Sequence, residues 1–145
     1  MDLKIKKLDP NAILPSYATQ GSAAFDISSL EEITILPGHT VKVRTGLAFE
    51  IPEGYELEIR PRSGLSLNSK IRLSNSPGTV DSDYRGEVHF ILDNLMTKFP
   101  NSYTVTKGQR LGQGIIRKVD RVEFVQVEEL SETQRGEKGF GSSGK

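Results

Sequence analysis

The sequence predicts an all-β domain, built as a β-sandwich, a jelly roll or a small barrel of short strands. Apolar and polar residues alternate along most of the chain, which is the period-two pattern of strands with one buried face. Turn signals containing proline or glycine interrupt this pattern at short intervals, as they do in sandwiches and barrels. Helical periodicity is scarce, and 145 residues suit one domain with one core.

The strands are predicted in chain order. Odd-numbered positions from Val41 to Ile51 are mostly apolar, and Leu57 and Ile59 continue the pattern with charged residues between them. Two later runs repeat it, and turn signals separate the segments. The later runs are Val88–Leu92 and Val122–Val127, and the turns are at Pro37-Gly38, Pro52-Glu53-Gly54, Pro77-Gly78 and Lys107-Gly108.

One short helix is predicted from Ser63 to Ser69, with Ser63 as its N-cap. No repeat or linker divides the chain, so residues 1–130 are expected to form one β-barrel domain. Residues 131–145 contain four glycines and only one large apolar side chain, Phe140, and cannot bury enough surface to order themselves. The ordinary interpretation is a frayed terminus. Arg135 and Phe140 on such a strip could instead clamp a ligand that has an anion and a flat ring.

Composition excludes several classes of function. Lysine and arginine balance aspartate and glutamate at 19 each, so no basic surface for nucleic acid or membrane binding is expected. The absence of cysteine removes disulfides, thiolate zinc sites and cysteine nucleophiles. The sequence shows neither a membrane-length apolar run nor a signal peptide. A soluble cytoplasmic protein is expected, in the host-cell cytoplasm if the source is viral.

The stretch from Thr79 to Glu87 carries the densest chemistry in the chain. It places two aspartates, an aromatic ring, an arginine and a glycine between apolar strand-like runs. Asp81 and Asp83 are two residues apart, so on an extended backbone both side chains leave the same face. An Asp-x-Asp pair also forms Asx turns, so the pair alone does not separate a catalytic site from a turn.

Two other segments carry polar groups that suit a phosphate or a base. Arg62 and Ser63 stand where a strand ends and the short helix begins, and the free N–H groups of a first helical turn bind anions. Asn75 offers a donor and an acceptor together, which suits the edge of a pyrimidine. The ordinary alternatives are an N-cap with surface arginines and a turn beside Pro77-Gly78.

Five segments together give a more specific signal. In order they read AAFDI (23–27), PRSGL (61–65), NSPGTVDSDYRG (75–86), GQRLGQ (108–113) and RGEKGFGSSG (135–144). They closely resemble the five motifs of the homotrimeric dUTP pyrophosphatase (dUTPase) family. The resemblance spans about residues 21 to 144, and the third and fifth segments are its most specific parts.

The resemblance implies both a fold and an activity. The expected fold is a jelly-roll-like distorted β-barrel of short antiparallel strands, with at most one short helix and a flexible C-terminal tail. Members of this family hydrolyse dUTP to dUMP and pyrophosphate, with water attacking the α-phosphorus. This reaction limits uracil incorporation into DNA and supplies dUMP for thymidylate synthesis. The chain is therefore expected to be an enzyme, a dUTP diphosphatase.

The resemblance also implies roles for two carboxylates. Asp81 would orient and deprotonate the attacking water, and positioned general-base help contributes about 10²–10⁴ in rate. Mg²⁺ is the implied cofactor, held mainly by the substrate phosphates, with Asp26 contacting it through its water shell. Asp83 and Arg85 are expected to shape the hairpin or to pair with each other.

The remaining matched residues are expected to bind the substrate. Asn75 and the backbone at Thr79 and Val80 would read the uracil edge, and Tyr84 would stack beneath the deoxyribose and exclude a ribose 2′-hydroxyl. Arg135 would reach the γ-phosphate, and Phe140 would cover the base. The other expected contacts are Gly78 in the hairpin, Arg62, Ser63, Gly64, Gln113 and His89 on the phosphate side, and Gly141 and Ser142 in the tail.

The family's site is shared among three subunits, so a homotrimer is expected, with the tail acting as a lid over a neighbour. The departures from the family pattern are Phe25, Ser66, Lys138, and the glycines at 112 and 114, which loosen the strand that carries Gln113. Two alternatives stay open: a non-catalytic nucleotide-binding regulator on the same scaffold, and an enzyme like dCTP deaminase.

Overall fold

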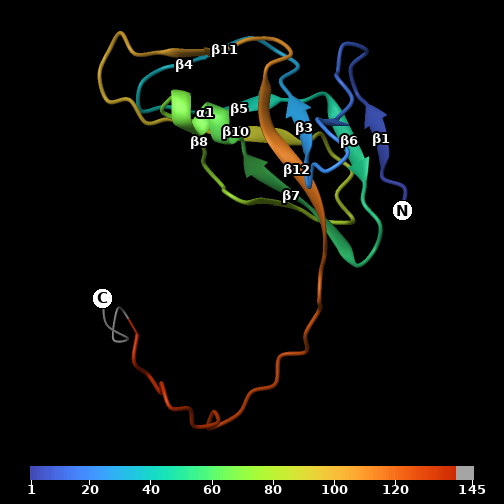
Figure 1. The fold of residues 1–145 in the computed structure, drawn as a ribbon, viewed down its shortest axis with the longest axis vertical. Coiled ribbons are helices and arrows are strands. Elements are labelled where there is room, and N and C mark those ends of the chain that lie inside the picture. The colour runs from blue at the N-terminus through green and yellow to red at the C-terminus, as the bar shows by residue number, and fades with distance from the viewer. Residues whose placement is uncertain (140–145) are drawn as a thin grey trace.

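The computed structural model describes residues 1–139, which form short β-strands and one short helix. Figure 1 shows the strands gathered into one barrel, from which the C-terminal segment runs away as an extended arm. The bounds are β1 (Lys4–Lys7), β2 (Ser16–Tyr17), β3 (Phe25–Ser28), β4 (Ile33–Ile35), β5 (Thr40–Arg44), β6 (Leu47–Glu50), β7 (Tyr55–Pro61), α1 (Ser63–Asn68), β8 (Ile71–Leu73), β9 (Gly78–Val80), β10 (His89–Asn94), β11 (Tyr103–Val105) and β12 (Arg110–Lys118).

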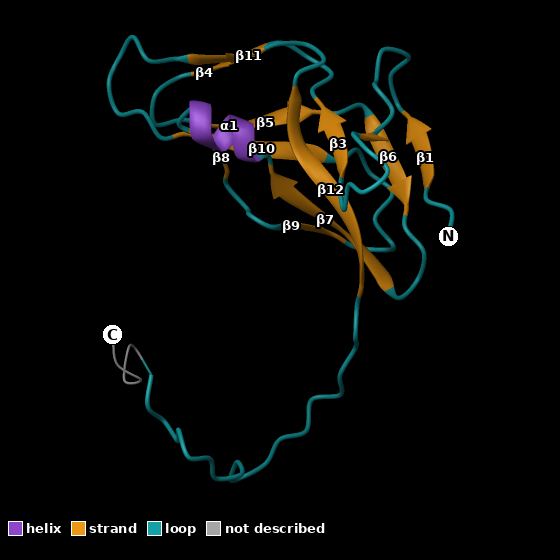
Figure 2. Cartoon of the chain, in the orientation of Figure 1, coloured by secondary structure: helices purple, strands orange, loops and turns teal. Residues whose placement is uncertain are grey.

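The strands pair antiparallel in four sheets (Figure 2), and their buried apolar side chains form one core cluster. The largest sheet has the order β2-β3-β12-β7-β9, a second has the order β5-β10-β8, and β1-β6 and β11-β4 form two small sheets. Most neighbouring strands are not consecutive in sequence, so distant segments lie side by side. This arrangement is the jelly-roll-type barrel that the family resemblance implies.

The predicted alternation is confirmed in the central strands. Leu57 and Ile59 of β7 are buried, as are Phe90 and Leu92 of β10, while their neighbours along the strands are less buried or exposed. The run from residue 41 to 51 is two strands rather than one, because Gly46 breaks it with a φ of 71°. That left-handed conformation favours glycine.

Two expectations about local structure are wrong. The helix N-cap is Arg62, not Ser63, and no side chain caps the helix. Residues 122–127 do not form a strand: β12 ends at Lys118, and every residue from 117 to 138 is exposed. A strand needs a neighbouring strand for its backbone hydrogen bonds. The arm runs away from the barrel, so the strands of this chain are too far away to pair with it.

The structure explains the two glycines of β12 that depart from the family pattern. A Cβ on Gly112 would lie 2.4 Å from a ring atom of Phe90, and one on Gly114 would lie 2.5 Å from a ring atom of Phe25. Both rings are buried in the core. The aromatic rings therefore fill the space that a side chain on β12 would need.

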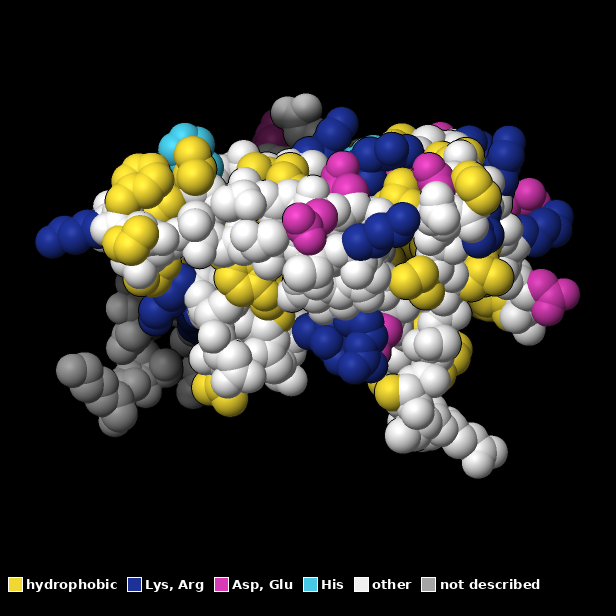
Figure 3. Space-filling view, turned by 90° about the horizontal axis from the view of Figure 1, so that it is seen from above, with side chains coloured by type: hydrophobic (Ala, Val, Ile, Leu, Met, Phe, Trp, Pro, Cys, Tyr) yellow, Lys and Arg dark blue, Asp and Glu magenta, His cyan; other side chains and the backbone are white. Residues whose placement is uncertain are grey.

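Charges of both signs are spread over the surface. Figure 3 shows lysine and arginine side chains interspersed with carboxylates and apolar patches on one face. At the β1–β6 edge, Lys4 donates a 2.7 Å hydrogen bond to Glu50, which lowers the pKa of that carboxyl. Among residues 1–139, no helix has the length and hydrophobicity needed to span a membrane.

Candidate active site

The segment from Gly78 to His89, the predicted hairpin, borders a pocket of about 230 Å³. Its two strands do not pair with each other, since β9 pairs with β7 and β10 pairs with β5 and β8, so this hairpin segment links two sheets. Asp81 lies directly after β9 and is exposed, so its carboxylate is accessible to a ligand in this pocket. Seven residues singled out in the sequence line the pocket together, although they span fifteen positions and two strands: Asn75, Gly78, Thr79, Val80, Asp81, Tyr84 and His89.

Backbone pairing and local hydrogen bonds hold this hairpin. The β9 arm pairs with β7, with Val80 opposite Leu57 and Gly78 opposite Ile59. At the tip, the Arg85 guanidinium donates to the carbonyl of Ser82 at 2.6 Å and to that of Tyr84 at 3.1 Å. Arg85 therefore shapes the hairpin, as expected, through backbone carbonyls.

Tyr84 packs against its own hairpin. Its hydroxyl donates to the carbonyl of Glu87 at 3.0 Å, and its ring lies over Gly86. A Cβ at Gly86 would meet the tyrosine hydroxyl at 2.4 Å, so only glycine leaves room for the ring in this position. Tyr84 remains 46% exposed, which leaves its ring available to a ligand.

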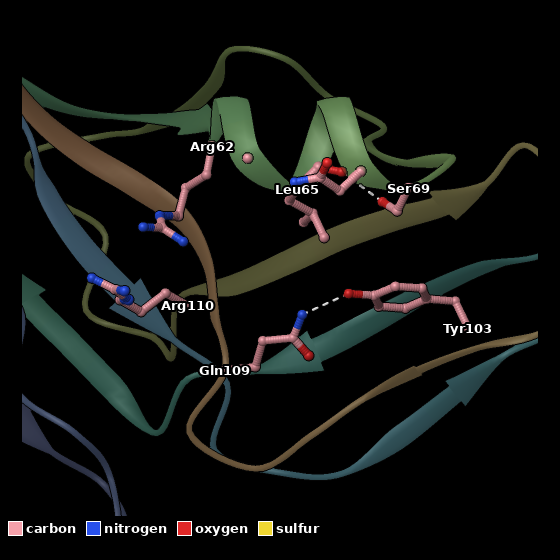
Figure 4. A pocket seen from close by; sticks show the side chains of 8 residues that line it. Arg62, Leu65, Ser69, Tyr103, Gln109 and Arg110 are labelled. Atoms are coloured by element: carbon pink, nitrogen blue, oxygen red, sulfur yellow. Dashed lines mark hydrogen bonds between the residues drawn. The ribbon is translucent and has the colours of Figure 1, made fainter.

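A second pocket, of about 350 Å³, lies between α1 and the start of β12 (Figure 4). Arg62 and Arg110 reach toward the same side of this pocket, and Gln109 donates to the Tyr103 hydroxyl at 2.6 Å on the other side. Gly64 and Leu65 of α1 also line it. A polar pocket with two guanidinium groups suits a phosphate chain.

Asp26 on β3 holds both arginines. Its Oδ1 lies 2.8 Å from Arg62 Nε, and its Oδ2 lies 2.9 Å from Arg110 Nη1. The Asp26 side chain is only 14% exposed, so solvent screens these pairs less than it screens surface pairs. Two positive charges against one carboxylate leave a net positive charge that favours an anion.

Gln113 lies beside this cluster on β12. It is opposite Asp26 in the pairing of β12 with β3 and opposite Arg60 in the pairing of β12 with β7. Its Nε2 donates to the carbonyl of Pro61 at 3.0 Å, so the side chain holds the residue that precedes Arg62. Ser63, the first residue of α1, is exposed. The phosphate-side residues of the sequence analysis, apart from His89, thus gather around the end of β7.

The chemistry of the donors is compatible with magnesium at Asp26 only through water. Among residues 1–139, no three histidine or carboxylate side chains come together as a metal site. Arg110 donates to Oδ2 of Asp26 and Arg62 is ion-paired with Oδ1, so each oxygen still has a lone pair that can accept from a metal-bound water. This fits Mg²⁺, which keeps several of its waters and binds mostly through substrate phosphates.

The tail contributes one described site residue. Arg135 Nε donates to the carbonyl of Lys138 at 2.8 Å within a local turn, in which Gly136 has a φ of 54°. The structure does not bring Arg135 to either pocket. Phe140, Gly141 and Ser142, which the sequence also singles out, lie outside the described residues.

The two pockets share no residue, so a single chain gathers the base-side and phosphate-side groups at different places. Sequence reasoning missed Arg110, which pairs with Asp26 from 84 positions away, and Glu87, which contacts Arg44. Charge alone could not single these residues out, because the chain carries 38 charged side chains. Both residues had a signal in the sequence, since Arg110 lies inside the fourth of the five segments and Glu87 ends the stretch from Thr79 to Glu87.

Comparisons with known proteins agree with this geometry. The family model described as dUTPase matches residues 10–144. Deoxyuridine 5'-triphosphate nucleotidohydrolase of Helicobacter pylori strain P12 is 47% identical over 99% of this chain and 97% of its own length. The protein of the same name from Nautilia profundicola is 48% identical over the full length of both chains.

Solved structures with a similar fold are also dUTPases. The dUTPase of Staphylococcus bacteriophage 80alpha, with the ligand dUPNHPP, superposes with a TM-score of 0.93 at 30% identity over 99% of this chain and 98% of its own. A mutant dUTPase from phage phi11 of S. aureus, described with a structural Mg(II) ion, has a TM-score of 0.85. It covers 91% of this chain and 100% of its own, and at 24% identity it shows similarity of fold alone.

Proposed function

The chain belongs to the dUTPase family, and we propose that it hydrolyses dUTP to dUMP and pyrophosphate by attack of water on the α-phosphorus. One observation carries this proposal beyond the family match. The residues expected to read the base and the sugar line one pocket, and the expected general base, Asp81, lies at the same pocket. A substrate held there has its uracil, its sugar and a carboxylate within one small volume.

Asp81 is proposed as the residue that orients and deprotonates the water. A carboxylate oxygen can accept the proton that the water loses. Its exposed position directly after β9 supports this role, because the hydrogen-bonded strand fixes the backbone while the side chain stays accessible. Such a positioned base contributes about 10²–10⁴ to the rate.

The hairpin pocket is proposed to select the base and the sugar. Asn75 and the backbone of Thr79 and Val80 would read the uracil edge, and Tyr84 would stack beneath the deoxyribose. The packing of Tyr84 over Gly86 supports this, because a ring held in place can exclude a 2′-hydroxyl. His89 lines the same pocket, and its Nδ1 donates to the carbonyl of Glu87 at 2.9 Å.

The arginine pocket is proposed to bind the phosphate chain. Arg62, Ser63 and Gly64 would contact the phosphates, with Gln113 beside them. The net positive charge around Asp26 supports this assignment. Arg135, Phe140, Gly141 and Ser142 would complete the site from the tail, with Arg135 on the γ-phosphate and Phe140 over the base.

We propose Mg²⁺ as the cofactor, with Asp26 holding it through water while the substrate phosphates provide its direct ligands. When bound, the ion would neutralise charge on the departing pyrophosphate. Strand β3 and the guanidinium groups of Arg62 and Arg110 would keep the Asp26 carboxylate in one orientation for this contact.

A homotrimer is proposed because, within one chain, the residues expected to bind the base and those expected to bind the phosphates lie in different pockets. Several subunits together could bring both sets to one substrate. The base-side pocket and the phosphate-side pocket share no residue, and Arg135 lies on the extended arm. The arm also exposes apolar side chains, including Phe124 at 96% and Val125 at 76%, which a neighbouring subunit could bury. We place the enzyme in the cytoplasm, since dUTP is an intracellular metabolite.

Pyrophosphate release from dUTP, dTTP, dCTP and UTP, measured side by side with magnesium and then with EDTA, tests the activity. Release confined to dUTP and lost with EDTA is expected. Binding of dUTP without any release would favour the nucleotide-binding regulator, and ammonia release from dCTP would favour the deaminase.

A further inference from the structure

We propose that the Glu87 side chain is a positioning residue that sets Tyr84 and thereby the preference for deoxyribose over ribose. The inference deepens the proposed function and rests on it. Glu87 lies at the end of the hairpin that returns to β10, and its side chain is only 15% exposed. Burying a carboxylate to this degree is costly unless it is paired and hydrogen-bonded.

The Glu87 carboxylate joins the hairpin to the turn between β5 and β6. Its Oε1 accepts from the Gly46 amide at 2.8 Å, and both of its oxygens lie 3.2 Å from Arg44 Nε. His89 Nε2 lies 3.7 Å from Oε2. The hydrogen bonds from Gly46 and Arg44 are charge-assisted, because their acceptor is a carboxylate, and this strengthens them relative to neutral ones. The side chain of residue 87 is therefore anchored to a segment 41 to 43 positions earlier in the chain.

The backbone of Glu87 links this anchored residue to Tyr84. Its carbonyl accepts the Tyr84 hydroxyl at 3.0 Å and contacts His89 Nδ1 at 2.9 Å. The hydroxyl end of the tyrosine side chain is thus held by the carbonyl of residue 87 and packs against Gly86. Any shift of residue 87 moves the acceptor to which Tyr84 donates, and the ring moves with it.

The Asp81 side of the hairpin has separate support. Val80 and Thr79 pair with β7, so the catalytic carboxylate does not depend directly on Glu87. Val88 is also held independently, since its amide donates to Leu47 at 2.9 Å and its carbonyl accepts from Thr45 at 2.6 Å. Loss of the Glu87 side chain should therefore loosen the segment around Tyr84 while β10 and the fold remain intact.

The experiment compares Glu87→Ala, Glu87→Gln and Arg44→Met with the unmodified enzyme. Arg44 lies on β5, outside the hairpin, and Arg44→Met removes the guanidinium while keeping the apolar stem. Glu50→Gln is the charge-matched control, because Glu50 is ion-paired with Lys4 on β1 and, in the described part of the chain, makes no hydrogen bond or ion pair with residues 81–87. For each protein, kcat and KM are measured for dUTP and for UTP, together with the melting temperature.

For Glu87→Ala, we expect the ratio of kcat/KM for dUTP to that for UTP to fall about tenfold, the size of one lost charged hydrogen bond. The change should appear mainly in the KM for dUTP, with kcat within about twofold. Glu87→Gln keeps an oxygen that can accept from the Gly46 amide, so its dUTP-to-UTP ratio of kcat/KM should fall only about threefold. Arg44→Met should lower the same ratio by about the same factor. In the double variant Arg44→Met/Glu87→Gln, the two losses should not add, because the residues share one interaction.

The outcomes separate the two proposals. If the unmodified enzyme does not hydrolyse dUTP, the proposed function fails. If it does, but the dUTP-to-UTP ratio stays unchanged in the variants, the role of Glu87 fails. A purely structural role would lower the melting temperature without changing the ratio. If Glu87→Ala does not fold, Arg44→Met decides the question by the same ratio.

Discussion

Arg62 Nε lies 2.8 Å from Oδ1 of Asp26, which joins the residue preceding α1 to strand β3. Arg110 pairs with the other oxygen of the same carboxylate, so one largely buried aspartate orients two guanidinium groups. The pocket that they border is thereby organised before any substrate binds. Such preorganisation reduces the entropic cost of holding a flexible triphosphate.

Replacing Asp26 by asparagine should disorganise both arginines. The amide has only one oxygen, and its NH₂ group faces a guanidinium donor. We expect kcat/KM for dUTP to fall at least about tenfold, with saturating magnesium recovering only part of the loss. Kinetics at several magnesium concentrations measure this, with Glu50→Gln as the control. Full recovery at high magnesium would mean that Asp26 acts through the metal alone.

Replacing Asp81 by asparagine should remove the general base and leave the pocket intact. Asparagine has nearly the same shape, so dUTP should still bind, while kcat should fall by about 10²–10⁴. Single-turnover kinetics and calorimetric titration with a non-hydrolysable dUTP analogue separate the two effects. Near-normal turnover would contradict the assignment. Asp83→Asn, two positions away on the same hairpin, is the matched control.

Removing residues 133–145 should leave a folded oligomer with little activity. The deletion removes Arg135 and the tail residues that are expected to cover the substrate, but it starts well after the end of β12 at Lys118. Thermal unfolding, light scattering and dUTP turnover are the measurements. Unfolding of the truncated protein would show the tail to be structural, and full turnover would remove it from the site.

Making the arm polar should weaken assembly. Phe124 is 96% exposed and Val127 is 54% exposed in the single chain, and burial of such side chains drives association. The double variant Phe124→Ser/Val127→Ser should shift the protein toward monomer in sedimentation and light-scattering measurements. Glu123→Ser/Gln126→Ser changes polar positions on the same arm and should assemble normally. An unchanged trimer in the apolar variant would place the interface elsewhere.

Introducing alanine at Gly112 should destabilise this protein. The new Cβ would lie 2.4 Å from the Phe90 ring and 3.0 Å from the Arg60 carbonyl. Overpacking of this kind costs about 1–3 kcal/mol in the free energy of unfolding. Denaturant unfolding measures it, with Gly21→Ala as the control because no atom lies within 4 Å of its added Cβ. Phe90→Leu should relieve the strain, and a stable single variant would contradict this packing.

Much of the fold could be predicted because each strand shows its own alternation of apolar and polar residues over a few consecutive positions. The alternation at Leu57 and Ile59, and at Phe90 and Leu92, needs only the period of an extended backbone, and both pairs are buried. The same signal failed at residues 122–127. Those residues alternate as a strand would, but pairing depends on a neighbour, and the arm has left the barrel.

By itself, the sequence determined the β class, the family and the hairpin residues that meet in one pocket. These depend on local periodicity and on closely spaced motifs, so no distant contact is needed to read them. Only the tertiary structure decided that Asp26 holds Arg110 across 84 positions and that Glu87 holds Arg44 across 43. Charged pairs have no period, and the antiparallel register of the sheets selects which of many charges meet.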